Sequence, residues 1–418
     1  MHTLNITRPW FQLHARLTCF VNDLIMAELA SIRPGSLLQL AMLADVDNAF
    51  GESGLHLDSL ELMALSIALS RAIHLDESHI EENLFAQPTL ANWLAISFKS
   101  LTAYSQSISF KTSGSVGIKK HYRHDIAQLE QEAYFLGQLF TGRKRILRAV
   151  PSHHIYGFMF TVLLPRYLGV SVPVIDIRGL SSNALQSMLN SGDLVIAYPE
   201  FWQYLDEANV HFPADIIGVN SSGPCATEVG INLLGKKLSS FYEIYGASET
   251  AGIGWRDHPS KPYTLFPFWQ KAASDTEIVR LLAVGNILTL PLQDVLQWSM
   301  PNQFIVQGRL DSIVQIGGIN VSLSAVRAKL LKHILVKDAA VRMMRPSEGS
   351  RLKAFIVLNS DNDYNNSESL EKGNQLEVIK HLQHYINTHL STAERPKALT
   401  FGNEMPLNQM GKSCDWSI

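Results

Sequence analysis

Four short apolar runs follow one another between residues 145 and 222 of this 418-residue chain. The runs read RILRAV, VPVIDI, DLVIAY and IIGVNS. Short uninterrupted apolar runs are typical of strands buried on both faces of a parallel sheet. Helical patterns accompany them, for example at Asp125–Phe140 and Ser181–Asn190. Strands that alternate with helices build a parallel sheet covered by helices, so we expect a layered α/β domain.

The regions on either side of these runs have a different pattern. Before about residue 100, apolar residues such as Leu60, Met63 and Ile67 recur at helical spacing, and Asp58 or Ser59 is a good N-cap for their helix. After Gly308–Asp311, helical, strand and helical patterns follow in SAVRAKLLKHIL, KAFIVLN and QLEVIKHLQHYINTHL. We therefore expect an α/β multidomain chain: a helical domain over 1–100, an α/β core over 101–308 and a small α+β domain over 309–418.

Composition excludes several classes of protein. Apolar residues make up 46% of the chain and charged residues 17%, which excludes a disordered or coiled-coil protein. The net charge of −3 provides no broad basic field, so we expect no nucleic-acid partner. Cysteines at 19, 225 and 414 are too scattered for a disulfide framework. Prolines and charges interrupt the longest apolar stretch, and the N-terminus lacks a signal pattern, so we expect no membrane span and a cytoplasmic location.

The segment Lys111–Lys120, KTSGSVGIKK, is the sharpest chemical signal. Small hydroxyl residues and glycines after a strand let backbone N–H groups surround a phosphate, and a lysine can neutralise its charge. The spacing is not that of a Walker A loop. Taken alone, the segment also fits an ordinary polar turn.

Further motifs follow this loop in a fixed order and carry a resemblance. They are PSHHIYGF at 151–158, NSSGPCA at 220–226, YEIYGASET at 242–250, PLQDVLQW at 291–298, GRLDSIVQIGGINVS at 308–322 and PLNQMGKS at 406–413. With TSGSVGIKK, they resemble the ordered motifs of the adenylate-forming superfamily, which includes acyl- and aryl-CoA ligases, peptide-synthetase adenylation domains and firefly luciferase. The resemblance covers about three quarters of the chain.

The resemblance implies a nucleotide site that uses ATP and Mg²⁺. The residues it assigns to ATP or AMP are Thr112, Ser113, Gly114, Ser115, Gly117, Lys120, Ser222, Gly223, Pro224, Tyr245, Gly246, Ser248, Asp294 and Arg309. Residues of the first loop would hold the β- and γ-phosphates, and Tyr245 would lie near the adenine. Ser248 would contact the α-phosphate, and Asp294 would bind the ribose hydroxyls.

Four further residues are assigned to catalysis and motion. Glu249 would help to hold Mg²⁺, and Lys412 would bridge the carboxylate and the α-phosphate. His154 would flank the acyl pocket, and Asp311 would be the hinge of a mobile C-terminal lid. Taken singly, each residue also fits a role outside catalysis: a surface carboxylate, a tail lysine or a hydrogen-bonded structural histidine.

The first 106 residues depart from the family pattern, which has a substantial subdomain before the phosphate loop. Here the segment GLHLDSLELM resembles the DSL motif of acyl carrier proteins, in which the serine carries phosphopantetheine. The resemblance makes Ser59 the phosphopantetheine candidate; the alternative is that Asp58-Ser59 only caps a helix. Val116 and Lys119 also replace the threonine and proline usual in the phosphate loop.

As a whole, the sequence resembles the compact ligases of aryl polyene and xanthomonadin pigment pathways, with a carrier-like N-terminus and a shortened adenylation core. This implies activation of an aromatic acid, such as a hydroxybenzoate or cinnamate, and thioester formation on an acyl carrier protein or CoA. Three alternatives stay open: a fatty acyl ligase, a loader of its own Ser59, and a catalytically weak carrier-docking scaffold.

Overall fold

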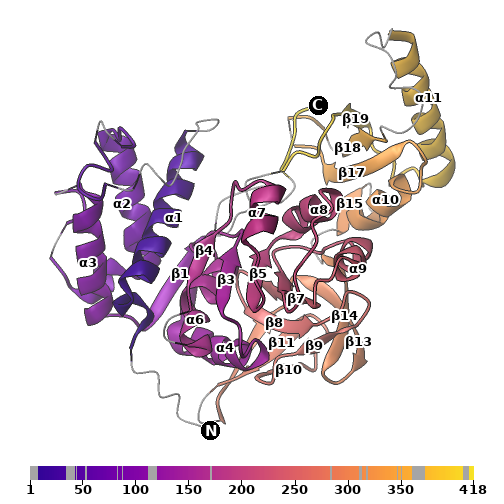
Figure 1. The fold of residues 1–418 in the computed structure, drawn as a ribbon. Helices are drawn as coiled ribbons and strands as arrows, with labels where there is room; N and C mark the ends of the chain where they lie inside the picture. Colours follow the sequence, from indigo (N-terminus) through magenta and orange to yellow (C-terminus); the bar gives the residue numbers. More distant parts are fainter. Residues whose placement is uncertain are drawn as a thin grey trace. The chain divides into compact units, whose positions relative to one another are not determined.

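A computed structural model describes most of the chain (Figure 1). The described residues are 8–33, 43, 45–51, 54–81, 83–86, 88–111, 120–169, 172–282, 285–309, 313–316, 319–345, 347–349, 351–359, 372–407 and 414–418. They divide into two compact units. The first contains the described residues of 8–111, 120–269 and 281–286, and the second contains those of 270–280 and 287–418.

The first unit begins with helices and continues as alternating strands and helices. Its helices are α1 (His14–Ile32), α2 (Ser59–Ile73), α3 (Leu90–Ala103), α4 (Ile126–Leu139), α5 (Ile155–Phe158), α6 (Pro165–Leu168), α7 (Ser182–Met188), α8 (Pro199–Glu207) and α9 (Thr227–Gly235). Its strands are β1 (Ser107–Lys111), β2 (His121–Asp125), β3 (Arg145–Arg148), β4 (Val174–Asp176), β5 (Asp193–Ala197), β6 (Ile217–Asn220), β7 (Ser240–Ala247), β8 (Ala251–Arg256) and β9 (Tyr263–Leu265).

The main sheet of this unit runs in the order β9-β8-β7-β6-β5-β3-β4. Strands β3 to β7 pair in parallel, whereas β7–β8 and β8–β9 are antiparallel. The four apolar runs form β3, β4, β5 and β6, so the expectation of a layered α/β fold is confirmed. Strands β1 and β2 form a separate antiparallel pair.

Both faces of the parallel strands are buried. Leu147, Val195 and Phe241 belong to one core cluster that also contains side chains from α7, α8 and α9. The alternate residues Ile146 and Leu194 point to the opposite face and are equally buried. This double burial explains why the strands read as continuous apolar runs rather than as alternating patterns.

Helix α2 begins at one of its two expected caps, and α3 also begins at a capped position. Asp58 caps α2: its carboxylate accepts from Glu61 N at 2.8 Å, and the Glu61 carboxylate accepts from Asp58 N at 3.0 Å. This reciprocal pair is a capping box. Of the two cap candidates, Asp58 therefore holds the position, and Ser59 is the first helical residue. Thr89 caps α3 by accepting from Asn92 N at 3.1 Å.

The second unit has its own elements and core. Its strands are β10 (Trp269–Lys271), β11 (Glu277–Leu281), β12 (Ile287–Pro291), β13 (Asp294–Met300), β14 (Gln303–Arg309), β15 (Ile313–Ile316), β16 (Ile319–Ser322), β17 (Val336–Met343), β18 (Leu352–Leu358) and β19 (Ala398–Phe401), and its helices are α10 (Leu323–Leu330) and α11 (Lys372–His389). The sheet β17-β18-β19 shares a buried core with residues of α10 and α11, among them Val326, Ile356 and Leu382. The α+β character expected for the C-terminal region is confirmed. Among the described residues, no helix is long and apolar enough to cross a membrane.

Candidate functional site

Three motif segments leave the same edge of the sheet in the first unit. The PSHH segment follows β3, the Asn220–Ala226 loop follows β6, and the turn with Ser248 and Glu249 follows β7. Parallel strands place their carboxyl ends at one edge, where α/β proteins bind their ligands. Motifs spread over 100 residues of sequence are thus brought to one edge of the fold.

The loop after β6 is shaped by buried hydrogen bonds. Ser221 Oγ donates to Ile244 O at 2.8 Å, which ties the loop to the neighbouring strand β7. The Asn220 amide donates to Gly223 O at 3.2 Å and to Glu243 Oε1 at 3.3 Å, and Asn220 is only 1% exposed. Ser222 has a φ of 75°, a left-handed conformation that its neighbours must support. The start of the proposed adenine loop is therefore tied to the neighbouring strand β7 and to its own Gly223.

The turn between β7 and β8 is equally constrained. A Cβ on Gly246 would lie 2.2 Å from Ala251 O, so only glycine fits there. Thr250 Oγ1 accepts from Ala247 N at 3.2 Å and closes the turn. Glu249 is half-buried, and its carboxylate makes no hydrogen bond or ion pair with the residues that the structure describes. The turn leaves one carboxylate with unused oxygens at the ligand edge of the sheet.

His124 is a site-adjacent residue that sequence reasoning missed. It lies on β2 and is 7% exposed, and its Nε2–H donates to Ser248 O at 2.7 Å. This bond ties the strand that follows the phosphate loop to the turn carrying Ser248 and Glu249. The only sequence signal was its place on a short strand a few residues after Lys120.

Tyr245 has a supporting aromatic and charged stack. Its ring centroid lies 5.8 Å from that of Tyr263, and the Arg256 guanidinium lies 4.6 Å from the Tyr263 ring centre. Arg256 Nε also donates to Glu243 Oε2 at 2.6 Å. Burial raises the pKa of Glu243 even though the Arg256 charge acts in the opposite direction. The stack packs the Tyr245 ring of β7 against Tyr263 of the neighbouring antiparallel strands.

The PSHH segment brings two histidines next to each other after β3. The rings of His153 and His154 lie 4.1 Å apart, and His154 occupies the N-cap position of α5. Burial lowers the pKa of His153 to about 4, so its ring is neutral at pH 7. The Tyr156 hydroxyl contacts Ala197 O at 3.1 Å and Val219 O at 2.9 Å, which fixes α5 across the ends of β5 and β6. His154 is thus held at the same edge as the nucleotide motifs.

The remaining predicted site residues belong to other parts of the chain. Lys120 is exposed directly before β2. Asp294 begins β13 and pairs in register with Arg309, the last residue of β14. Residues 112–119, Asp311 and Lys412 lie outside the described residues, and so does the side chain of Arg309. The assigned roles of these residues are taken up below as proposals.

The described residues contain no cluster of three or more side chains that could hold a metal ion alone. A lone carboxylate nevertheless fits Mg²⁺, which is commonly held by one or two carboxylates together with substrate phosphates. The unused oxygens of Glu249 meet that requirement.

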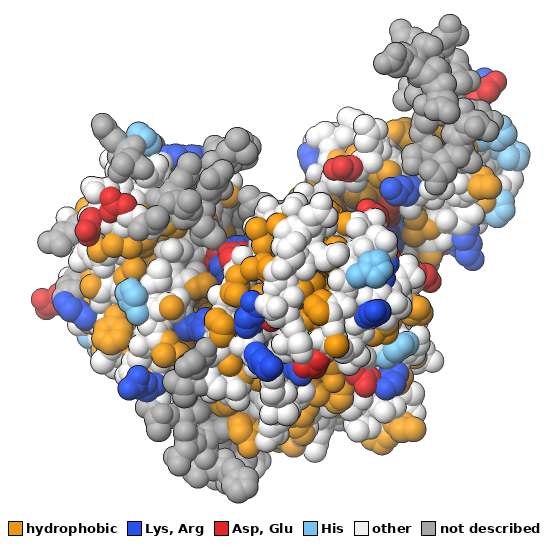
Figure 2. All heavy atoms as spheres, in the orientation of Figure 1, with side chains coloured by type: hydrophobic (Ala, Val, Ile, Leu, Met, Phe, Trp, Pro, Cys, Tyr) orange, Lys and Arg blue, Asp and Glu red, His pale blue; other side chains and the backbone are white. Residues whose placement is uncertain are grey.

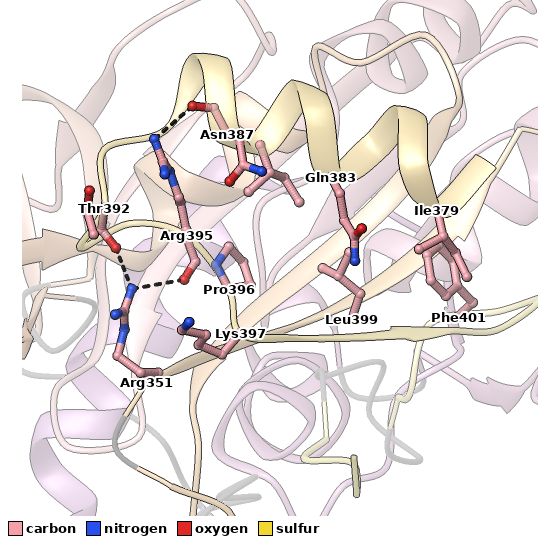
Figure 3. Close-up of a pocket in the computed structure, with 11 residues that line it drawn as sticks. Arg351, Ile379, Gln383, Asn387, Thr392, Arg395, Pro396, Lys397, Leu399 and Phe401 are labelled. Carbon is pink, nitrogen blue, oxygen red and sulfur yellow. Dashed lines mark hydrogen bonds between the residues drawn. The ribbon is translucent and has the colours of Figure 1, made fainter. Parts of the chain in front are cut away.

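A pocket of about 420 Å³ lies within the C-terminal unit, between α11, β19 and the loop before β19 (Figure 3). Arg351 donates to main-chain oxygens of Thr392 and Arg395. Arg395 donates to Asn387 O at 2.7 Å and Leu390 O at 2.9 Å. Arg395 therefore satisfies carbonyls at the end of α11, as helix ends require, whereas Arg351 bonds to carbonyls of the loop that follows the helix. None of the lining residues belongs to the predicted site.

Comparisons with known proteins agree with this arrangement. The C-terminal domain of AMP-binding enzymes is matched over residues 326–412. The chain is 35% identical over 371 residues to the 4-coumarate–CoA ligase of Halorhodospira halophila, an alignment that covers 88% of this chain and 90% of the relative. It is 34% identical to the 4-coumarate–CoA ligase of Rhodobacter capsulatus, covering 88% and 92%.

Solved structures share the fold. ATP-bound MatB from Rhodopseudomonas palustris superposes with a TM-score of 0.59 at 13% identity, covering 96% of this chain and 91% of MatB. The o-succinylbenzoate coenzyme A synthetase of Bacillus subtilis, in complex with AMP, has a TM-score of 0.54 at 18% identity, covering 73% and 67%. The chain belongs to the AMP-binding enzyme family, the adenylate-forming superfamily. Within it, this chain is a relative of bacterial 4-coumarate–CoA ligases.

Proposed function

We propose that this protein is an AMP-forming acid–thiol ligase that uses ATP to activate an aromatic carboxylic acid and then forms a thioester. The proposal rests chiefly on one observation: 4-coumarate–CoA ligases are 32–35% identical to the chain across 88% of its length. The convergence of motif segments at one sheet edge supports the same function. We propose a hydroxycinnamate- or hydroxybenzoate-like acid as the substrate.

The first half-reaction joins the acid to AMP. A carboxylate oxygen attacks the α-phosphorus of ATP, a P–O bond to pyrophosphate breaks, and the acyl-adenylate forms. This chemistry needs neutralised charge and correct orientation more than acid–base catalysis. We assign the phosphate loop with Lys120 to the β- and γ-phosphates, Ser248 to the α-phosphate and Asp294 to the ribose. Lys412 would place its ammonium beside the reacting oxygens.

Mg²⁺ would be held by Glu249 together with phosphate oxygens of ATP. The ion supplies charge stabilisation on the phosphates when it is bound. Thr250 and Gly246 keep the turn in shape, so the Glu249 carboxylate stays at the ligand edge without a competing partner among the described residues.

The second half-reaction transfers the acyl group to a thiol. The thiol sulfur bonds to the acyl carbon, AMP leaves, and the thiol proton is released. The relatives named as CoA ligases favour CoA as the acceptor. We keep a carrier protein as the second acceptor because the region around Ser59 has the DSL pattern. We propose rotation of the 309–418 domain about Asp311 between the half-reactions.

We propose that residues 1–100 act as a carrier-like segment joined to the adenylation core at 101–308, as in the pigment-pathway ligases that the sequence resembles. Ser59 is exposed, and its hydroxyl makes no hydrogen bond with the described residues. Because Asp58 supplies the cap, the Ser59 hydroxyl is not used as a cap and could carry a phosphopantetheine group. The alternative, which we expect from the contacts of this region, is that Ser59 stays unmodified and the segment has a structural role.

One assay tests the main proposal. Pyrophosphate release is measured with ATP, Mg²⁺ and a panel of hydroxycinnamic, hydroxybenzoic and fatty acids, each with and without CoA. We expect release that depends on an aromatic acid, and an acyl-CoA product detected by mass spectrometry. Release only with long-chain acids would establish a fatty acyl ligase instead. No acid-dependent release would favour a scaffold and overturn the proposal.

A further inference from the structure

A buried carboxylate on α1 contacts the segment that carries the two histidines. Asp23 is 2% exposed, and its Oδ2 accepts from Ser152 N at 2.6 Å and from Ser152 Oγ at 2.7 Å. Ser152 directly precedes His153 and His154. A helix near the chain start therefore holds the proposed acyl-site segment through a residue 129 positions away.

Asp23 is held in turn by two arginines from the strand ends. Arg148 Nη1, at the end of β3, donates to Asp23 Oδ2 at 2.5 Å, and Arg178 Nη2 donates to Oδ1 at 2.7 Å. Both arginines also contact Asp176 at the end of β4. Two positive and two negative charges thus balance, and the arginine charges hold the pKa of Asp23 well below its usual range. A buried charge that is paired and fully hydrogen-bonded fixes its geometry closely.

A second carboxylate on α1 contacts the start of the phosphate loop. Lys111 Nζ lies 2.6 Å from both Glu28 Oε1 and Glu28 Oε2. Lys111 is the last residue of β1 and directly precedes Thr112, the first residue of the phosphate motif. The side chains of Glu28 and Lys111 are 16% and 27% exposed, so the pair is shielded from water on most sides.

We infer that α1 is a positioning helix for the adenylating site, on which Asp23 sets the Ser152–His154 segment and Glu28 sets Lys111 at the start of the phosphate loop. The inference rests on the proposed function for the roles of those two segments. It assigns neither carboxylate to catalysis, because both act through other residues. Under this inference, α1 affects the binding of both substrates. Asp23 acts on the acid site through Ser152, and Glu28 acts on the ATP site through Lys111.

The same ion pairs would be present if α1 only stabilised the fold. The test must therefore distinguish an effect on the geometry of the proposed site from an effect on the stability of the protein. Ser152→Ala removes one hydroxyl and leaves Asp23 with both arginines and the Ser152 amide. A net hydrogen bond is worth roughly two- to tenfold in an equilibrium. We expect KM for the aromatic acid to rise by about that factor while KM for ATP stays within twofold. Ser100→Ala is the matched control, since Ser100 is buried on α3 and its hydroxyl has no partner among the described residues.

Glu28→Gln tests the other contact by removing the charge while keeping the shape. We expect KM for ATP to rise by roughly two- to tenfold, with KM for the acid unchanged. Asp206→Asn is its matched control. Asp206 pairs with Lys236 at 2.5 Å, with similar side-chain exposure of 14% and 19%. It lies near the end of α8, toward the sheet edge opposite the motif loops.

Amide hydrogen exchange provides a readout that does not depend on activity. We expect faster exchange at residues 152–155 in Ser152→Ala and at 107–111 in Glu28→Gln, with each control unchanged. The inference is supported if Ser152→Ala raises only the KM for the acid, Glu28→Gln raises only the KM for ATP, and exchange rates rise only in the corresponding segments. Equal rises in both KM values with a lower melting temperature would show that α1 only stabilises the fold, and would overturn the inference.

Unchanged KM values would also overturn the inference, whatever the exchange shows. If the wild-type protein releases no pyrophosphate with any acid, the proposed function fails. The exchange data then still test whether α1 positions the two segments. Local increases confined to the two segments then uphold it, and their absence rejects it.

Discussion

The two units of this chain hold their motif residues in different ways. In the first unit, the loops at the sheet edge are fixed by side chains that are almost fully buried, such as Asn220, Glu243 and Thr250. In the second unit, Asp294 stands at the start of the partly exposed strand β13, while the buried core formed by β17-β18-β19, α10 and α11 lies further along the chain. In the first unit, buried contacts set the shape of the motif loops. In the second unit, Asp294 is held by strand pairing with Arg309.

The largest effect that this comparison predicts is in the second unit. Lys412→Ala should lower the rate of acid-dependent pyrophosphate release by about two to three orders of magnitude, because a positive charge at the reacting oxygens is lost. Lys412 lies six positions before the final residue, so we expect the melting temperature to stay unchanged.

Lys397→Ala is the matched control for Lys412→Ala. Lys397 is an exposed lysine of the same unit whose ammonium has no partner among the described residues, and its removal should leave the rate unchanged. A Lys412→Ala protein that releases pyrophosphate at the wild-type rate would show that the second unit contributes no charge to adenylation.

The next effect concerns Asp311, the residue about which the 309–418 domain is proposed to rotate. Asp311→Pro fixes φ at a proposed hinge whose backbone angles must change between half-reactions. We expect pyrophosphate release within a few-fold of wild type and a loss of thioester formation of at least about tenfold. Separate single-turnover measurements of acyl-adenylate and of acyl-CoA check this. Equal loss of both steps would contradict a hinge at this residue.

A smaller effect is expected in the first unit. Glu249→Gln keeps the shape of the turn and removes the charge that favours Mg²⁺. We expect the Mg²⁺ concentration for half-maximal pyrophosphate release to rise by about tenfold, with the fold intact. Glu228→Gln, on the exposed first turn of α9, is the control. An unchanged Mg²⁺ dependence would remove Glu249 from the metal site.

The sequence predicted the elements whose physics is local. The runs RILRAV and DLVIAY became β3 and β5 because strands buried on both faces need apolar residues at every position. The cap at Asp58 depends on a contact three residues away, which a sequence shows directly. The gathering of motif segments at one edge followed from parallel topology.

The contacts that connect distant segments could not be predicted. Asp23 and Glu28 look like the polar face of an amphipathic helix, yet they contact Ser152 and Lys111, which lie 129 and 83 positions away. Periodicity reports which face of a helix is polar, but it does not report what that face meets. His124 was missed for the same reason, since its partner Ser248 lies 124 residues further along.

Two helices of the N-terminal region also differ in how far their side chains are buried. Helix α1 turns Asp23 toward the segment after β3 and Glu28 toward β1. Helix α2 instead exposes Leu60, Met63 and Ile67, which are 75%, 48% and 43% exposed. Figure 2 shows hydrophobic side chains at the surface of this region. Arg33, just after α1, donates to Glu61 of α2 at 2.5 Å and connects the two helices. The exposed apolar face of α2 is thus connected to a helix whose carboxylates contact β1 and the segment after β3.

The smallest expected effect is on Ser59, which lies at the start of α2. Ser59→Ala should leave pyrophosphate release within twofold of wild type, because every described motif segment at the sheet edge lies after residue 107. Coexpression with a broad phosphopantetheinyl transferase, followed by intact mass measurement, tests modification directly. We expect no mass increase, because the Arg33–Glu61 pair and the α1 contacts give this region a structural duty. A mass increase of one phosphopantetheine group that Ser59→Ala abolishes would contradict this and establish self-loading.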